Sequence, residues 1–324
     1  RWDVGGGAFN SNNADVSVQN SSLSGGALNI GSGTSFTSTA LVNITAGQFN
    51  AIDAEFVRFG SVSISGTGIL NGPASTMYVN GIFDISDVGG AEFNHNNGTA
   101  VFEGNNCGIA VNATIAGTAR FRSLVVNLPS DLSVFSFDAN GGIDSAIVES
   151  DIHLTNGTFV TGTLFAQGGV TVASTFDGGA GSLYFNGSSM QNFLNEGGLN
   201  PTGPLFIDKP SGSVTAVSDL ILSPTQALNI GSGTLHLNDG SDLTVGNVTI
   251  GSSGRLVNSS STTLTFGGNV SNSGRIDLQG GGADCPDGDV ILIRSTVPGT
   301  QRQWNGTGTF RIVDANIQDM AGTA

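Results

Sequence analysis

Apolar residues recur along this chain in pairs separated by one polar residue, which is the pattern of a β-strand with one buried face. The octapeptide ALNIGSGT shows the pattern in full and occurs twice, letter for letter, at 27–34 and 227–234. Leu228 and Ile230 face one side of a predicted strand, and the Gly-Ser-Gly that follows turns the backbone, because glycine accepts a positive φ. The alternation therefore predicts short strands joined by glycine turns.

These apolar pairs return about every 20 residues, and each return predicts the same side of the next turn of a stacked coil. One predicted series is Leu228/Ile230, Val248/Ile250 and Val270, and the second is Leu237, Val257 and Leu278. We expect Ile230, Ile250 and Val270 to stack as one inward column. A parallel β-solenoid of about 16 coils accounts for the spacing, since stacked strands lie about 4.8 Å apart.

A longer repeat organises the middle of the chain. LVVNLPS at 124–130 matches LFIDKPS at 205–211, a shift of 81 residues. We therefore expect three segments: an N-terminal entry and docking segment at 1–13, a solenoid of 81-residue units at 14–287, and a terminal capping region at 288–324.

The blocks at 205–250 and 292–319 resemble the repeats of large secreted bacterial surface proteins of adhesin-like, right-handed parallel β-helix type. The similarity is good over 175–319 and weaker over 1–120. The resemblance implies an all-β, elongated, right-handed parallel β-helix without substantial helix. It also implies a cell-surface or extracellular-fibre role, and it brings no catalytic signature.

Composition points the same way. The net charge of −15, with Lys209 as the single lysine, should repel nucleic acid and anionic membranes. No apolar run approaches the roughly 18 residues of a membrane span. The chain begins at Arg1 rather than Met, so we expect that a signal peptide has been removed and that the protein is secreted.

Ten asparagines head N-x-S/T triplets, which are acceptors for N-glycans in secreted proteins. The best candidates precede glycine and are expected in exposed turns: Asn97, Asn156, Asn186 and Asn305. The alternative is that a composition rich in Asn, Ser and Thr produces such triplets by chance.

Asp284, Asp287 and Asp289 could offer oxygen ligands to Ca²⁺, although a solvated Asp-Gly turn explains them as well. No cofactor is expected otherwise. Arg255, Arg275 and Arg294 recur at spacings of 20 and 19 residues, with Arg275 and Asp277 facing outward. Such a column would suit an acidic polysaccharide, but Arg–Asp pairing on the surface is the favoured interpretation.

The parallel β-helix also carries polysaccharide lyases and glycosidases, which need paired carboxylates. Glu149/Asp151 and Asp53/Glu55 have the required spacing along a strand, but such pairs arise easily by chance. We therefore expect no enzyme. Cys107 and Cys285 lie 178 residues apart, too far along a straight solenoid for a bridge within one chain.

The sequence thus predicts a secreted structural subunit of an extracellular fibre, whose copies join end to end. An open solenoid exposes unpaired strand edges at both ends, and Trp2 is the expected contact on the neighbouring copy. Two alternative functions stay open: a carbohydrate-binding adhesin module and a β-helix polysaccharide enzyme. The alternative to end-to-end assembly is that residues 1–324 are an excerpt of a longer chain, whose next repeats cover the open end.

Overall fold

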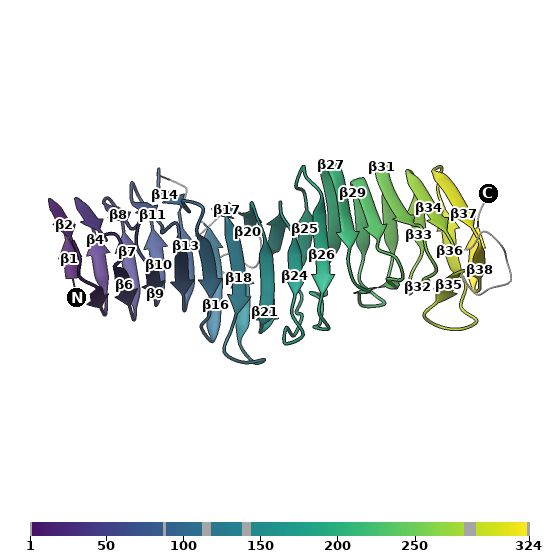
Figure 1. Cartoon of the computed structure of the whole chain (residues 1–324), viewed down its shortest axis with the longest axis horizontal. Helices are drawn as coiled ribbons and strands as arrows, with labels where there is room; N and C mark the ends of the chain where they lie inside the picture. Colours follow the sequence, from purple (N-terminus) through teal and green to yellow (C-terminus); the bar gives the residue numbers. More distant parts are fainter. Residues whose placement is uncertain (1, 87–88, 112–117, 138–143, 282–289, 323–324) are drawn as a thin grey trace. The chain divides into compact units, whose positions relative to one another are not determined.

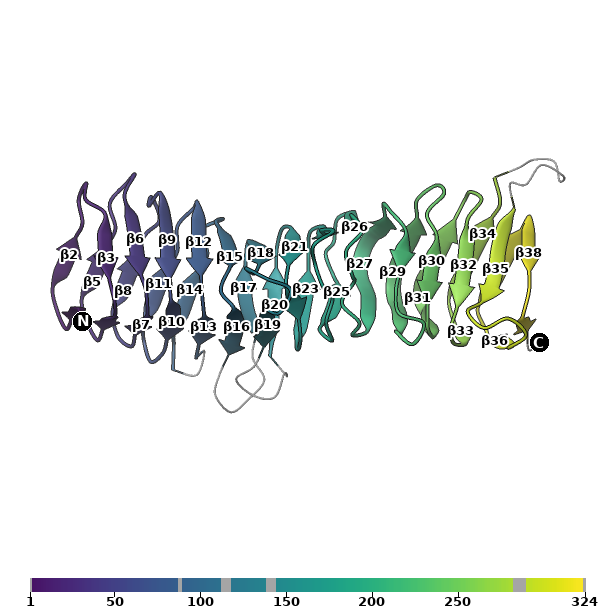
Figure 2. The ribbon, with the colours of Figure 1, turned by 90° about the horizontal axis from the view of Figure 1, so that it is seen from below.

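The computed structural model describes residues 2–86, 89–111, 118–137, 144–281 and 290–322. In this part of the chain every regular element is a strand, and there is no helix. Each strand runs parallel to the strand one turn later in the sequence, as Figures 1 and 2 show. The fold is a parallel β-solenoid of about 14 turns with roughly 21 residues each. The predicted fold class is confirmed, with slightly longer and fewer turns than expected.

The chain forms two compact units, Arg1–Leu164 with Thr175–Gly178 and Phe165–Ser174 with Gly179–Ala324. The earlier turns of the first unit, up to residue 94, have three sides, which we name sheets A, B and C. In its later described turns sheet B is no longer present and sheet C forms two of the sides, because residues 99–102 pair with 123–126 and residues 118–121 pair separately with 145–148.

Sheet A contains β1 (Trp2–Val4), β4 (Ser21–Leu23), β7 (Leu41–Ile44), β10 (Ser61–Ile64), β13 (Ile82–Ile85), β16 (Asn106–Val111), β19 (Val134–Phe137) and β22 (Thr158–Phe159). Sheet B contains β2 (Ala8–Asn10), β5 (Ala27–Asn29), β8 (Gln48–Asn50), β11 (Ile69–Asn71) and β14 (Glu92–Asn94). The sheet C strands of this unit are β3 (Val16–Val18), β6 (Ser35–Ser38), β9 (Phe56–Phe59), β12 (Thr76–Val79), β15 (Thr99–Phe102), β17 (Thr118–Phe121), β18 (Ser123–Asn127), β20 (Ser145–Val148) and β21 (Ile152–Asn156).

The second unit also has strands of sheet C, some of them long enough to bend around a corner. They are β24 (Val170–Val172), β25 (Ser182–Phe185), β26 (Gln191–Asn195), β27 (Leu205–Ala216), β29 (Leu228–Leu237), β31 (Val248–Asn258), β33 (Val270–Asn272), β34 (Arg275–Gln279), β36 (Arg302–Asn305), β37 (Thr309–Val313) and β39 (Met320–Gly322). Its other side, sheet D, contains β28 (Leu220–Ile221), β30 (Leu243–Val245), β32 (Thr263–Phe266), β35 (Ile291–Ser295) and β38 (Ala315–Ile317). Strand β23 (Thr163–Ala166) crosses the boundary between the units.

Alternation along each strand builds the core. In β9, Val57 and Phe59 are fully buried, whereas Phe56 and Arg58 face outward. Burying such side chains stabilises the fold by about 1.5–3 kcal/mol each. The interior of the first unit is rich in phenylalanine, and its fully buried rings are Phe36, Phe49, Phe59, Phe83, Phe102, Phe121, Phe135, Phe137, Phe159 and Phe176.

A ladder of asparagine side chains follows sheet B. Each Nδ2 donates to the Oδ1 one turn earlier: Asn29 to Asn10 and Asn50 to Asn29 at 2.7 Å, Asn71 to Asn50 at 2.6 Å, and Asn94 to Asn71 at 2.9 Å. Side-chain amides carry both donors and an acceptor, so one residue type can continue this chain over many turns.

The first predicted column of the second unit is right for two turns and wrong for the next, and the second is wrong from its first step, because Val257 lies beside His236 rather than Leu237. Ile230 lies on Ile250, but Ile250 then lies on Asn272, while Val270 lies on Val248. In the second series, Val257 faces outward and Asn258 is the buried residue that stacks on Leu278. Turns of unequal length shift the register, which a constant spacing of 20 residues cannot follow.

The two copies of ALNIGSGT adopt related but different structures. The first copy forms the whole of β5 in sheet B with its first three residues and then turns. Most of the second copy lies inside the long sheet C strand β29. In both copies the apolar pair is buried, and the second glycine bends the chain with a positive φ, 66° at Gly33 and 82° at Gly233. The predicted bend is confirmed.

Candidate functional site

The last turn of the second unit exposes side chains at positions that are buried one turn earlier. Ile276 is fully buried, but its neighbour in register on β37, Phe310, is 37% exposed. Likewise Ile293 is fully buried, and Ile317 beside it on β38 is 49% exposed. The interior of the solenoid is therefore open to solvent at this turn.

An apolar hollow of about 460 Å³ lies in this last turn. Its lining residues are Ile293, Trp304, Phe310, Ile312, Ile317, Met320 and Gly322. The Trp304 ring packs against Phe266 and Phe310, with centroid distances of 5.2 and 6.0 Å. Its buried Nε1 donates to no atom of the described chain. An exposed apolar surface of this kind is typical of an interaction site.

The first turn of the first unit also exposes an apolar side chain at a position that the next turn buries. Phe9 on β2 is 39% exposed, although Leu28 beside it on the next turn is fully buried. The Trp2 ring meets Phe9 edge to face, with centroids 4.4 Å apart. Trp2, the predicted assembly contact, is itself partly exposed on β1. Two aromatic rings therefore stand together on this turn.

The backbone edges of both turns are also open in the described structure. Strands β1, β2 and β3 each pair only with the following turn. Strands β37, β38 and β39 each pair only with the preceding one. Unpaired N–H and C=O groups on a strand edge are a template for another strand.

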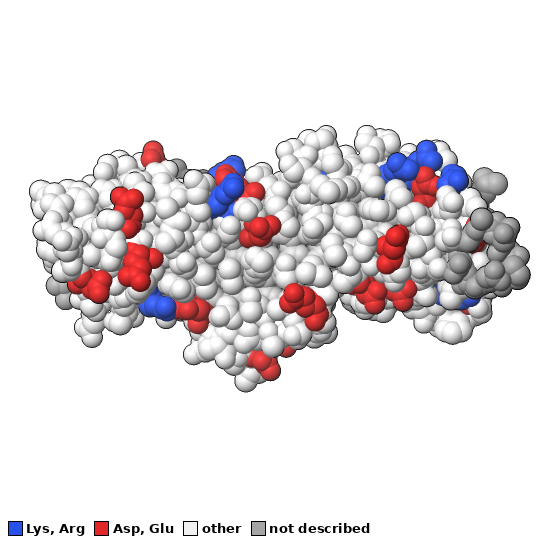
Figure 3. Space-filling view, viewed as in Figure 1, with Lys and Arg blue, Asp and Glu red and all other residues white. Residues whose placement is uncertain are grey.

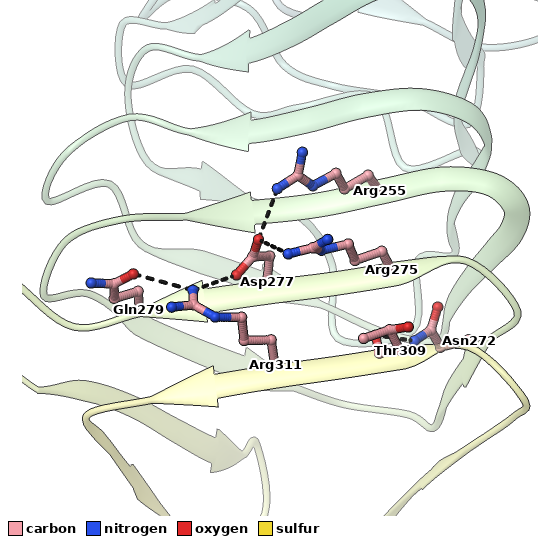
Figure 4. Close-up of polar contacts among 7 residues, drawn as sticks. All are labelled: Arg255, Asn272, Arg275, Asp277, Gln279, Thr309 and Arg311. Carbon is pink, nitrogen blue, oxygen red and sulfur yellow. Dashed lines mark hydrogen bonds and ion pairs between the residues drawn. The ribbon is translucent and has the colours of Figure 1, made fainter.

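A second candidate site is a group of arginines on sheet C, drawn in Figure 4. Arg255 on β31, Arg275 on β34 and Arg311 on β37 all donate to the carboxylate of Asp277, at 2.7, 2.8 and 2.9 Å. These hydrogen bonds, the one from Arg311 first, lower the pKa of Asp277 to about 2. The carboxylate is therefore ionised at neutral pH. We call these four residues the arginine cluster.

The arginine cluster corrects one sequence expectation and supports another. Arg255 and Arg275 are neighbours in register and face outward, as predicted. Arg294 does not continue their column, because it lies on β35 of sheet D and donates to the Asn316 carbonyl at 2.6 Å. Arg311, which the spacing rule missed, takes the third place, since the chain between β34 and β37 is longer than one ordinary turn.

A smaller charged group lies in the first unit around Glu149. Its carboxylate is 3.3 Å from Arg120 Nη1, 3.9 Å from Arg122 Nη1 and 3.4 Å from His95 Nε2. Glu103 pairs with Arg58, whose guanidinium also lies 4.2 Å from the centroid of the Tyr78 ring. Glu149, considered above as one of a catalytic pair, is thus paired with Arg120 and Arg122 and lies beside His95.

An outward aromatic stack in the second unit was not predicted. The ring of Tyr184 lies 4.8 Å from Phe165 and 5.2 Å from Phe206, centroid to centroid, one strand apart each time. The Tyr184 hydroxyl donates to Asp208 Oδ2 at 2.9 Å. The Tyr184 ring therefore has a neighbouring ring on each side. Sugar rings prefer aromatic faces, so we assign this stack to stability.

The candidate glycosylation sites differ in exposure. Asn97 is exposed in a turn, as expected, whereas Asn156, Asn186 and Asn305 are half-buried. Asn156 Nδ2 also donates to the Leu128 carbonyl at 2.8 Å. Glycosylation of all four stays a prediction, with Asn97 the most accessible.

The remaining predicted residues are the Ca²⁺ candidates, the two cysteines and the second carboxylate pair. Asp284, Asp287, Asp289 and Cys285 fall outside the described residues, while Cys107 is a buried free thiol. Asp53 and Glu55 are exposed. In the described ranges, no group of three or more His, Cys, Asp or Glu side chains could hold a metal ion. Nor does this part of the chain contain a helix able to cross a membrane.

Comparison of this chain with protein-family models, with curated proteins and with solved structures finds no match. The class of protein is therefore defined by the fold: a parallel β-solenoid built of glycine-rich turns.

Proposed function

We propose that this chain is a structural subunit of a secreted extracellular fibre, in which copies join end to end. The observation that carries the proposal is the apolar hollow of the last turn, where inward positions that earlier turns bury are exposed. Covering Phe310 and Ile317 with another turn would remove apolar area from water, at about 25 cal/mol per Å².

The proposed occupant of the hollow is the first turn of a second copy. That turn offers Trp2 and Phe9 as apolar side chains and three open strand edges, β1 to β3. The last turn offers three open edges in return, β37 to β39. Such a contact is heterologous, because it joins two different surfaces, and a heterologous contact that does not close into a ring continues into a filament.

Secretion is supported by the composition, with its single lysine and its many Asn-x-Ser/Thr triplets, and by the exposed Asn97. A structural role is supported by the core, since every turn packs chiefly on its two neighbours and fixes their spacing. No partner other than further copies is needed for this role.

Two matched substitutions test the contact, Phe9→Glu on the first turn and Ile317→Glu on the last. Both place a charge on an exposed apolar position, so the fold should persist. Electron microscopy and sedimentation velocity should show fibres for the native chain and single subunits for each variant. A mixture of the two variants should give dimers only, because one intact surface of each kind remains. Leu132→Glu, at a highly exposed position outside both turns, is the control and should assemble normally.

Other outcomes refute the proposal. If Phe9→Glu alone formed dimers, the contact would join two last turns rather than a last and a first turn. If deletion of residues 1–10 left fibres of unchanged repeat, the first turn would not be the occupant.

A further inference from the structure

The arginine cluster carries more positive charge than its own carboxylate can neutralise. Three guanidiniums surround one carboxylate, which leaves a net charge of +2 on three neighbouring strands. Figure 3 shows this as a blue group around one red group on sheet C of the second unit. The whole chain has a net charge of −15 and only ten cations, so three in one place is a strong local departure.

The arrangement leaves donors available to a ligand. Asp277 is 11% exposed and lies beneath the guanidiniums, whereas the three arginine side chains are each exposed by more than two-fifths. Arg255 and Arg275 each use one Nη2 for Asp277, and Arg311 uses Nη1 for Asp277 and Gln279. A guanidinium has five N–H donors in a planar fork, so each arginine keeps outward donors.

The described positions in register beside Arg255 and Arg275 add no negative charge other than Asp277. The preceding strand β29 places Thr234 beside Arg255 and His236 beside Val257. On the other side, β37 places Thr309 beside Arg275. Adjacent arginines on neighbouring strands repel one another, and Asp277 relieves this only in part. Anionic groups from outside would neutralise the remaining positive charge.

We propose that the arginine cluster is a binding site for an acidic polysaccharide that carries carboxylate groups. Guanidinium forks bind planar carboxylates through two parallel hydrogen bonds. Arg255, Arg275 and Arg311 follow one another from strand to strand, so a linear polymer with a charged group on successive sugars contacts more than one of them. Several weak contacts on one polymer bind more tightly than one exposed ion pair.

A nucleic acid fits less well. Duplex DNA carries one charge per about 1.7 Å, so the net charge of the chain repels it more strongly than a sparsely charged polyuronate. Single-stranded nucleic acid is held by exposed aromatic faces. The described outward neighbours of the cluster on β29 and β31 are Thr234, His236 and Val257, none of them Trp, Tyr or Phe.

The test measures binding of polygalacturonate to the immobilised full chain at low salt, with neutral dextran as the blank. Arg275→Gln should weaken binding at least several-fold and make it less sensitive to salt. Asp277→Asn should strengthen it, because the competing carboxylate becomes neutral and the local charge rises to +3. Arg294→Gln removes an arginine from sheet D and should leave binding unchanged.

The opposite effects of Arg275→Gln and Asp277→Asn separate binding from a purely structural role, in which both would only lower the melting temperature. Equal binding by the native chain and Arg275→Gln would overturn the proposal, as would no binding to polygalacturonate at all. Dextran sulfate and an oligothymidylate are tested in parallel. Binding to dextran sulfate alone would overturn the carboxylate assignment, and binding to the oligonucleotide alone would overturn the polysaccharide class.

Discussion

Lys209 is the single lysine of the chain, and it is only 2% exposed. Its ammonium donates to the carbonyl oxygens of Gly187 at 2.7 Å and Ser189 at 2.9 Å, and to Gln191 Oε1. All three acceptors are uncharged. Burial without a counter-charge disfavours the ammonium and lowers the pKa of Lys209 to about 8.

This pKa makes the stability of the fold depend on pH in a defined direction. In the unfolded chain the pKa returns to its ordinary value of 10.5. Between about pH 8 and pH 10.5 the unfolded chain therefore holds a proton that the folded chain has released, so folding becomes more favourable as pH rises. At 1.36 kcal/mol per pKa unit, the free energy of unfolding should gain at most about 2 kcal/mol between pH 7 and pH 9.5.

The assay is urea unfolding of the native chain and of Lys209→Met at both pH values. The variant keeps every other titrating group, so the difference between the two proteins isolates Lys209. Lys209→Met should be less stable at both pH values, because the carbonyls of Gly187 and Ser189 lose their donor. Its deficit should grow by at most about 2 kcal/mol at pH 9.5. If the deficit stayed constant or shrank, the lowered pKa would be wrong.

Three further predictions concern a core residue, one rung of the asparagine ladder and a buried thiol. Ile250→Asp should lower the free energy of unfolding by several kcal/mol, because it buries an unpaired charge between Ile230 and Asn272. Ile250→Val should lower it by only about 0.5–1.5 kcal/mol, and equal melting temperatures of the two variants would disprove this register. Asn50→Ala removes two hydrogen bonds of the asparagine ladder and should lower the free energy of unfolding by roughly 1–3 kcal/mol. The control Asn192→Ala, at an exposed position, should change it little, and similar values for both variants would mean that the ladder adds no stability. Burial raises the pKa of the Cys107 thiol to about 11, so this thiol should resist iodoacetamide at neutral pH until urea unfolds the chain. Rapid labelling of the folded protein would contradict its burial.

The inward face of both octapeptide strands could be predicted from the sequence, because alternation is a local property, whereas the inward prediction for Val257 was wrong, since Leu256 and Asn258 are the buried residues there. Leu28 and Ile30 in one octapeptide, and Leu228 and Ile230 in the other, are all buried. The sheet to which each octapeptide belongs could not be predicted. That assignment depends on how many residues precede it within the turn, and identical letters carry no information about it.

Contacts between distant turns were predicted less well, since they depend on the sum of all turn lengths between them. Arg255 and Arg275 were matched across one ordinary turn, but the next turn is longer and brings Arg311 rather than Arg294 to Asp277. The apolar hollow has a different cause. Phe310 and Ile317 continue the columns of Ile276 and Ile293, and only the structure shows that nothing in the described chain covers them.

The asparagine ladder restricts how such a chain can change in length during evolution. Each rung donates backwards and accepts from the next, so the run from Asn10 to Asn94 has a fixed direction. A duplication that copies one whole turn adds one rung and leaves every existing bond in place. An insertion inside the ladder strand would instead displace an amide from its column, whereas the corners accept extra residues, since successive rungs are 19, 21, 21 and 23 residues apart. Genes for solenoids of this kind should therefore change in length by whole turns or at the corners, with asparagine retained at this one position.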